Sequence, residues 1–294
     1  MHSHPQLSLV LSPQSPARPP LSRWPALPWA MASILAPLGL MLGFPGATLA
    51  QDSPDPSSDS SAMELSPVQH DPLNSPHPVP WDWVMSTYET VSSQQEKGVR
   101  YYRSPALVSP DGEYAAYSRI QLQIEPELYR SRVSSVLFLE NLQTGGLRVI
   151  SGQSPFAQGM LRSDDRRLNP GAITILMPVS WTEDGSRVLA REFEGWFSSS
   201  DISDYALVWE RDSDQTHTLA PNTVGYTTAV LLGWSTNNPS QILFRAGAVG
   251  EEPWPLWAVS LGGETSLAME DQPLVIGESQ SSFWVGPQAH YHLR

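Results

Sequence analysis

Cysteine is absent from the 294 residues. Its absence excludes disulfide bonds, thiolate metal sites, cysteine nucleophiles and a lipid-modified N-terminal cysteine. Positive charge is also scarce, because Lys97 is the only lysine and 17 basic residues face 30 acidic ones. The formal net charge of −13 repels phosphate-rich partners, which argues against binding to nucleic acid or to an anionic membrane surface.

Acidic residues are in turn missing from the first 50 positions, and residues 26–44 carry no charge at all. Arg18 and Arg23 precede this apolar stretch, and small residues before position 51 fit the cleavage pattern of signal peptidase. The pattern predicts a signal peptide over residues 1–50 and an exported protein, periplasmic or secreted, or in a thylakoid-type lumen. An uncleaved anchor is the alternative, although two prolines interrupt the apolar stretch. After cleavage we expect no membrane span.

Residues 51–80 are dominated by serine, proline and aspartate and hold few apolar side chains. Burial of so little apolar surface cannot offset the entropy lost on ordering. The composition therefore predicts a disordered acidic linker. His70 and His77 lie in it, and they lack the neighbouring ligands that a metal site requires.

The composition changes at residue 81. Apolar residues then recur at helical spacing: Val84, Tyr88 and Val91. This periodicity predicts one helix within 81–97 that covers an exposed edge of the following structure. Ser86 and Glu89 have the spacing of a capping box, and Gly98 is a helix stop signal.

From residue 104 the chain reads as strands joined by turns. The stretch "SPDGEYAAYSRI" (109–120) places an Asp-Gly turn before an alternating, strand-like run. The same order of strand, turn and strand recurs in "MPVSWTEDGSRVLAREF" and in "AVLLGWSTNNPSQILFRAG". The matching positions are Val108, Trp181 and Trp234, and the two tryptophans are interpreted as packing residues. The repeat predicts three four-stranded antiparallel units, over about 104–151, 173–220 and 226–270.

These repeats resemble the blades of TolB-type β-propellers, which are similar to the propellers of prolyl-oligopeptidase-type enzymes. The resemblance covers about residues 104–270 and implies an all-β, propeller-like array of three four-stranded blades, preceded by one helix. It also implies exported, protein-binding or substrate-gating roles. Residues 273–292 are expected to supply part of a fourth blade, so that the propeller-like domain spans 81–294. A β-sandwich of the same strands is the alternative.

Propellers typically close with four to eight blades, and three leave a sheet face and an edge exposed. The array is therefore expected to be shielded by the helix or closed by a second copy, as a homo-oligomer.

No catalytic constellation is present in the sequence. The Gly277–Ser281 run is a G-x-S-x-S without the closing glycine of a nucleophile elbow, and only 13 residues follow Ser281, too few for a hydrolase domain. His290 and His292 lack a third metal ligand at recognisable spacing. Asp212–Asp214 fits a hairpin turn better than a calcium loop. We therefore predict no catalytic residues, no cofactor and no metal site.

The loops offer a different kind of site. In a four-stranded meander the first and third turns share one end, so the loops 121–132, 194–204 and 247–255 share the other, together with the insertion 152–172. Each loop carries an aromatic residue beside carboxylates. The predicted partner-binding residues are Tyr129, Glu194, Trp196, Asp201, Asp204, Glu251, Glu252 and Trp254.

Large aromatic residues are favoured interface anchors, and flanking acids select basic or polar partners. The sequence therefore predicts a non-catalytic binding protein that engages another envelope protein. A carbohydrate-binding module is the alternative, and a hydrolase whose residues are not recognised is a third interpretation. Trp196 and Trp254 have a structural alternative as well, which is to fold back over the sheets.

Overall fold

The computed structural model describes residues 70–152, 170–282 and 284–289. All of them belong to one compact unit, Met63–Arg294. The predicted signal peptide, the linker before residue 70, most of the insertion and His290–His292 lie outside the described residues. Within the described ranges no helix is long and apolar enough to span a membrane.

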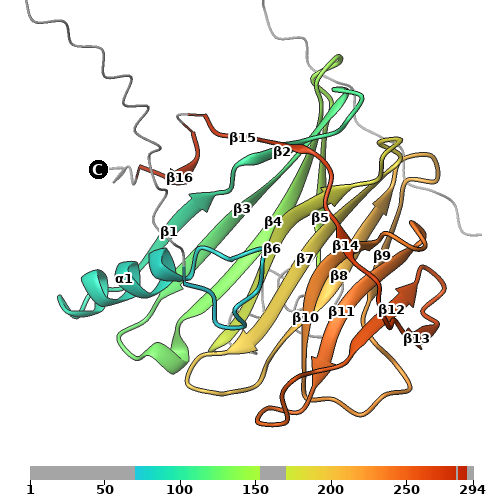
Figure 1. The fold of residues 1–294 in the computed structure, drawn as a ribbon. Coiled ribbons are helices and arrows are strands. Elements are labelled where there is room, and N and C mark those ends of the chain that lie inside the picture. The colour runs from blue at the N-terminus through green and yellow to red at the C-terminus, as the bar shows by residue number, and fades with distance from the viewer. Residues whose placement is uncertain (1–69, 153–169, 283, 290–294) are drawn as a thin grey trace, which may run out of the picture. The chain divides into compact units, whose positions relative to one another are not determined.

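The described residues are mostly strand, which confirms the all-β class, and Figure 1 shows the strands following one another as antiparallel meanders. The first meander contains β2 (Ala106–Val108), β3 (Tyr114–Ile124), β4 (Arg132–Asn141) and β5 (Leu147–Ser151). The second contains β6 (Ala172–Trp181), β7 (Arg187–Trp196), β8 (Ile202–Glu210) and β9 (Gln215–Leu219). The third contains β10 (Thr228–Ser235), β11 (Gln241–Gly247), β12 (Leu256–Ser260) and β13 (Thr265–Leu267).

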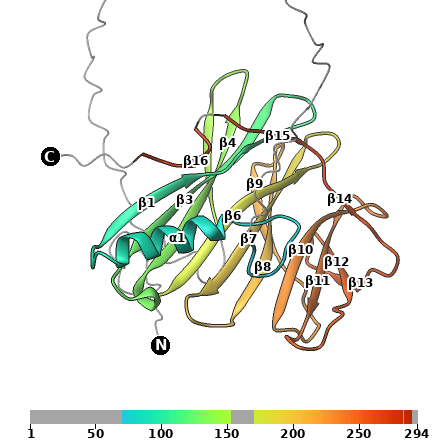
Figure 2. The ribbon, with the colours of Figure 1, turned by 60° about the vertical axis from the view of Figure 1, so that its left-hand side comes forward.

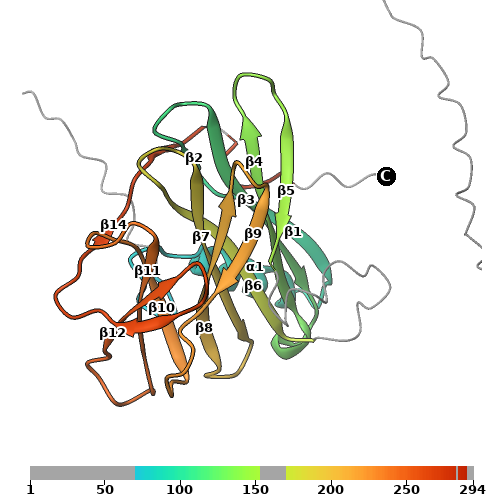
Figure 3. The same cartoon turned by 90° about the vertical axis from the view of Figure 1, so that its right-hand side faces the viewer.

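The first two meanders belong to one sheet, joined where β4 and β6 pair in parallel, and the third forms a sheet of its own. Two apolar layers fill the space between neighbouring meanders, because successive strand residues point to opposite faces. Trp181 (0 % exposed) lies between the first and second meanders, with Leu137 and Leu207. Trp234 (1 % exposed) lies between the second and third, with Leu189 and Phe244. Figure 3 shows the third meander beside the second. The prediction that both tryptophans are packing residues is confirmed.

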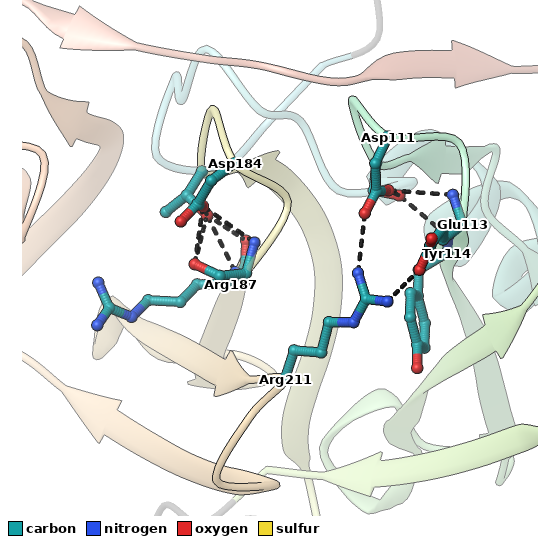
Figure 4. Close-up of polar contacts among 9 residues, drawn as sticks. Asp111, Glu113, Tyr114, Asp184, Arg187 and Arg211 are labelled. Atoms are coloured by element: carbon teal, nitrogen blue, oxygen red, sulfur yellow. Dashed lines mark hydrogen bonds and ion pairs between the residues drawn. The ribbon is translucent and has the colours of Figure 1, made fainter.

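The turns after β2 and β6 repeat one hydrogen-bonding design (Figure 4). The Ser109 hydroxyl donates to Asp111, and the Thr182 hydroxyl donates to Asp184 at 2.6 Å. Hydrogen bonds, foremost that from Thr182, lower the pKa of Asp184 to about 2. Arg211, from the turn after β8, donates to Asp111 at 2.8 Å. The turn after β2 is therefore tied to the turn after β8 in the neighbouring meander.

The helix is shorter than predicted. Helix α1 (Trp81–Ser92) has no side-chain cap, and Ser86 lies inside it, donating to the carbonyl oxygen of Asp82 at 2.6 Å. The capping-box prediction is therefore wrong. Gly98 does not stop the helix but begins β1 (Gly98–Arg103), which pairs with the far half of β3.

Helix α1 covers a sheet face, not an edge (Figure 2). Its buried residues Val84 and Val91 pack with Ile120, Leu122 and Phe193. Burial of this apolar stripe, and not capping, stabilises the helix.

The prediction of a disordered linker is wrong for residues 70–80, because this segment is packed onto the strands. Asp71 is 8 % exposed and accepts hydrogen bonds from Arg191 Nη1 at 2.7 Å and from the backbone N–H of Val79 at 3.0 Å. The His77 ring lies 2.9 Å from the carbonyl oxygen of Leu232. A buried arginine on β7 therefore orders a segment whose composition alone predicts disorder.

The predicted partial fourth blade at residues 273–292 is wrong in its described part. Instead, three short strands each pair with a different strand from earlier in the chain. β14 (Pro273–Leu274) pairs with β10, β15 (Glu278–Gln280) with β2, and β16 (Gly286–Pro287) with β1. Between β14 and β15, the carbonyl oxygen of Ile276 accepts a hydrogen bond from Trp181 N at 2.8 Å. The tail thus contacts the first strand of every meander and satisfies edge groups there.

Candidate functional site

The three predicted loops do share one end of the meanders, opposite the turns after β2 and β6 (Figure 1). Five of the eight predicted residues line two pockets: Glu194, Trp196 and Asp201 line one, and Glu252 and Trp254 line the other. Tyr129, Asp204 and Glu251 line neither of these two. One pocket lies on the second meander and the other on the third.

The smaller pocket, of about 170 Å³, brings together Glu194, Trp196 and Asp201 beside Tyr205. Asp201 is exposed in the loop after β7, and Trp196 is half-buried at the end of that strand. Tyr129 is 55 % exposed in the short 3₁₀ helix Leu128–Arg130. It lies near Trp196, because both residues line the space around Gly171.

Glu194 differs from a surface acid. It is 2 % exposed, and burial, with a smaller contribution from the charge of Glu192, raises its pKa to about 9. Its carboxyl group therefore carries no charge at neutral pH. The interpretation of Glu194 as an acid that attracts basic partners is corrected.

The prediction that Asp204 contacts a partner is also wrong. Asp204 is fully buried, accepts a hydrogen bond from Arg191 Nε at 2.7 Å and another from the backbone N–H of Leu231 at 3.0 Å. A partner cannot reach it. Arg191 joins Asp204 to Asp71, so these residues connect the N-terminal segment, the second meander and the third.

The larger pocket, of about 820 Å³, lies on the face of the third meander that points away from the second. Strand residues, turn prolines and Trp254 supply most of its walls, and Arg245, Glu252 and Gln272 supply polar groups. The lining residues are Leu73, Asn74, Pro76, Val230, Leu232, Arg245, Glu252, Pro253, Trp254, Leu256, Asp271, Gln272 and Pro273.

Trp254 folds back while still lining this pocket. Its indole Nε1 donates to the carbonyl oxygen of Ala248 at 2.9 Å, and its ring lies against Gly247, where an added Cβ would meet Trp254 Cδ1 at 2.5 Å. Glu251 and Glu252 are exposed in the same loop. The ring is therefore held in one orientation at the pocket wall.

The sequence interpretation missed half of this pocket. Residues 73–76 have a composition that predicts disorder, residues 271 and 272 lie between the predicted elements, and Pro273 begins the predicted partial fourth blade. The sequence could have placed Val230, Leu232 and Leu256 on the outer face of the third meander, because strand alternation puts them on the side opposite to the core residues.

The remaining motifs form no reactive site in the described residues. Ser279 lies in β15 opposite Leu107, and Asp214 accepts a hydrogen bond from Trp209 Nε1 at 3.0 Å in the turn after β8. The part of the chain that the structure describes contains no group of three or more metal-ligating side chains.

No family model matches the chain, and no curated protein matches its sequence. Among solved structures, the acylaminoacyl peptidase of Pyrococcus horikoshii is similar over 58 % of this chain, with 12 % identity and a TM-score of 0.32. The chain covers about a quarter (25 %) of that protein's length. The TolB-type resemblance stays a prediction, while the fold itself is an all-β series of antiparallel meanders.

Proposed function

We propose that this chain is an exported, non-catalytic binding protein whose three meanders are the blades of a propeller-like array. In this proposal, the pocket on the third meander receives a segment of another envelope protein. The observation that supports it is the 820 Å³ pocket, whose lining combines apolar side chains with polar and charged ones. Pockets of about 300–1,000 Å³ with this composition are typical of binding sites.

The shape of the lining favours an apolar polypeptide segment. Leu232 and Leu256 project from strands, and Pro253 and Pro273 add rigid walls that lose little entropy on binding. Arg245 and Glu252 lie among these apolar residues and supply opposite charges that would fix the orientation of a bound backbone. A binding partner with one apolar side chain flanked by polar groups fits this arrangement.

Affinity capture from native envelope extract tests the proposal, with the tagged full chain as bait. We expect one partner that the native chain retains and that Trp254→Ala combined with Glu252→Gln loses. Trp196→Ala is the matched control, because it alters the smaller pocket on the second meander. If the partner is lost with Trp196→Ala and retained by the double variant, the assignment to the third meander is wrong. Thermal unfolding of each variant checks that the fold persists.

Carbohydrate binding is the second candidate, because Trp254 and Glu252 place an indole ring and a carboxylate in one pocket with Gln272. Retention on a polysaccharide that salt barely weakens would favour it over a protein partner. Closure of the array by a second copy, and hydrolase activity, stay predictions of the sequence.

A further inference from the structure

The first meander has an outer face that carries two arginines directly opposite each other. In the antiparallel pair of β1 and β3, Arg103 lies opposite Arg119. Residues in that relation have Cβ atoms about 5 Å apart, and like charges there are destabilising. An anion bound between the two guanidinium groups would remove this repulsion.

Aromatic rings hold both guanidinium groups in place. Arg103 Cζ lies 3.8 Å from the centre of the Tyr117 ring, and Arg119 Cζ lies 4.5 Å from that of Tyr101. Tyr117 in turn stacks on Phe138, with ring centres 5.4 Å apart. Stacked guanidinium groups keep their N–H edges available, so they are ordered before any ligand arrives.

These arginines form no ion pair with the described residues, although the chain is strongly acidic. Six other cations do pair with carboxylates: Lys97, Arg130, Arg148, Arg187, Arg191 and Arg211. Arg132 lies on the same face, opposite Gln123, and its buried Nε and Nη2 atoms have no hydrogen-bond partner among the described residues. Glu140 is the acid that strand register places on this face, and it is hydrogen-bonded to Tyr117, on whose ring Arg103 lies.

A groove of about 330 Å³ lies on this face, lined by Tyr101, Arg119 and Phe138 together with Gln121 and Ser134. Arg103 lies beside the groove, opposite Arg119. Apolar side chains extend the face toward β5. Val149 is 53 % exposed opposite Phe138, and Leu147 is 55 % exposed opposite Glu140. Cationic, hydrogen-bonding and apolar groups therefore lie in adjacent rows of one sheet face.

We propose that this groove binds an extended acidic peptide segment, with carboxylates on Arg103 and Arg119 and apolar side chains toward Val149. Arginine forks pair with carboxylates through two parallel hydrogen bonds. A sugar would need a bare ring to stack on, but Tyr117 is 9 % exposed between Arg103 and Phe138, and Arg119 covers Tyr101. The site is separate from the pocket on the third meander and does not depend on the function proposed for it.

Titration calorimetry with the full chain and a synthetic peptide of alternating glutamate and valine tests the proposal. Arg103→Gln with Arg119→Gln should weaken binding by about tenfold or more, because two charge-assisted hydrogen-bonding groups are lost. Arg100→Gln is the matched control, since Arg100 is an arginine of β1 without an ion pair among the described residues, and strand alternation places it on the face opposite to Arg103. Native binding should also weaken as salt is raised.

Thermal unfolding of each variant monitors the fold. If the double variant unfolds, Arg119→Lys replaces it. This variant keeps the positive charge but loses the two parallel N–H donors of the guanidinium group, so it should still weaken binding several-fold. Equal binding by native and variant protein, or no binding by native protein, would overturn the proposal. So would tight binding of polygalacturonate without binding of the peptide, which would make the groove a glycan site. Self-association of the native chain in sedimentation, abolished by the double variant, would make a second copy the occupant.

Discussion

Buried charges at single residues connect parts of the chain that are distant in sequence. Arg191 donates to Asp71 and to Asp204, each at 2.7 Å, and its side chain is 0 % exposed. Asp204 in turn accepts a hydrogen bond from Leu231 on the third meander. Because each charge has a partner, the cluster orients three segments at once, and loss of any one member would leave the others buried without compensation.

Glu194 presents the opposite case, a buried acid whose neutral form is favoured. Its folded pKa of about 9 exceeds the ordinary 4.5, so the folded chain keeps a proton that the unfolded chain releases. Stability from this group is therefore fully present below about pH 4.5 and is lost as pH rises toward 9. Glu194→Gln should remove that loss and stabilise the protein at pH 8 by about 1–3 kcal/mol.

Urea unfolding at several pH values measures this effect. The exposed Glu251→Gln is the control and should leave the pH dependence unchanged. A native-like fall in stability from pH 6 to 9 in Glu194→Gln would contradict the assignment of a neutral carboxyl group.

At the scale of elements, the C-terminal tail holds the first strands of the meanders together. Its path depends on Gly277, which has a φ of +125° and lies where an added Cβ would meet Leu107 at 3.0 Å and Trp181 at 3.1 Å. Only glycine adopts that backbone without strain and also leaves room for the two side chains.

Gly277→Ala should therefore destabilise the protein by more than backbone strain alone, which is about 1–3 kcal/mol. Gly250→Ala is a matched control, because Gly250 also has positive φ (+90°) but no atom within 4 Å of the added Cβ. Thermal unfolding compares the two variants. Equal losses in Gly277→Ala and Gly250→Ala would show that the tail is not packed against Leu107 and Trp181.

At the scale of the whole molecule, stability depends on whether the chain includes residues 70–80. A chain that begins at residue 70 keeps Asp71 and His77, whereas one that begins at residue 81 removes the Asp71 carboxylate and the His77 carbonyl oxygen that accept hydrogen bonds from the buried Arg191. We expect the first to unfold at the native temperature and the second about 10 °C lower. Scanning calorimetry of both chains checks this. Equal unfolding midpoints would show that residues 70–80 do not stabilise the fold and belong to the linker.

The sequence by itself determined the strand repeat, the turns and the residues that fill the layers between meanders. Alternation and Asp-Gly turns are local signals, so Trp181 and Trp234 could be assigned to the core from their positions in the repeat. It also placed the three loops at one end, because the order of turns in a meander fixes their direction.

Only the tertiary structure decided which loop carboxylates are available to a partner. Asp204 and Asp201 look alike in sequence, but the first meets Arg191 across a strand pair and the second stays in solvent. Long-range partners likewise ordered residues 70–80 and directed the tail along three strands. Such contacts depend on which segments the fold brings together, and local composition does not encode them.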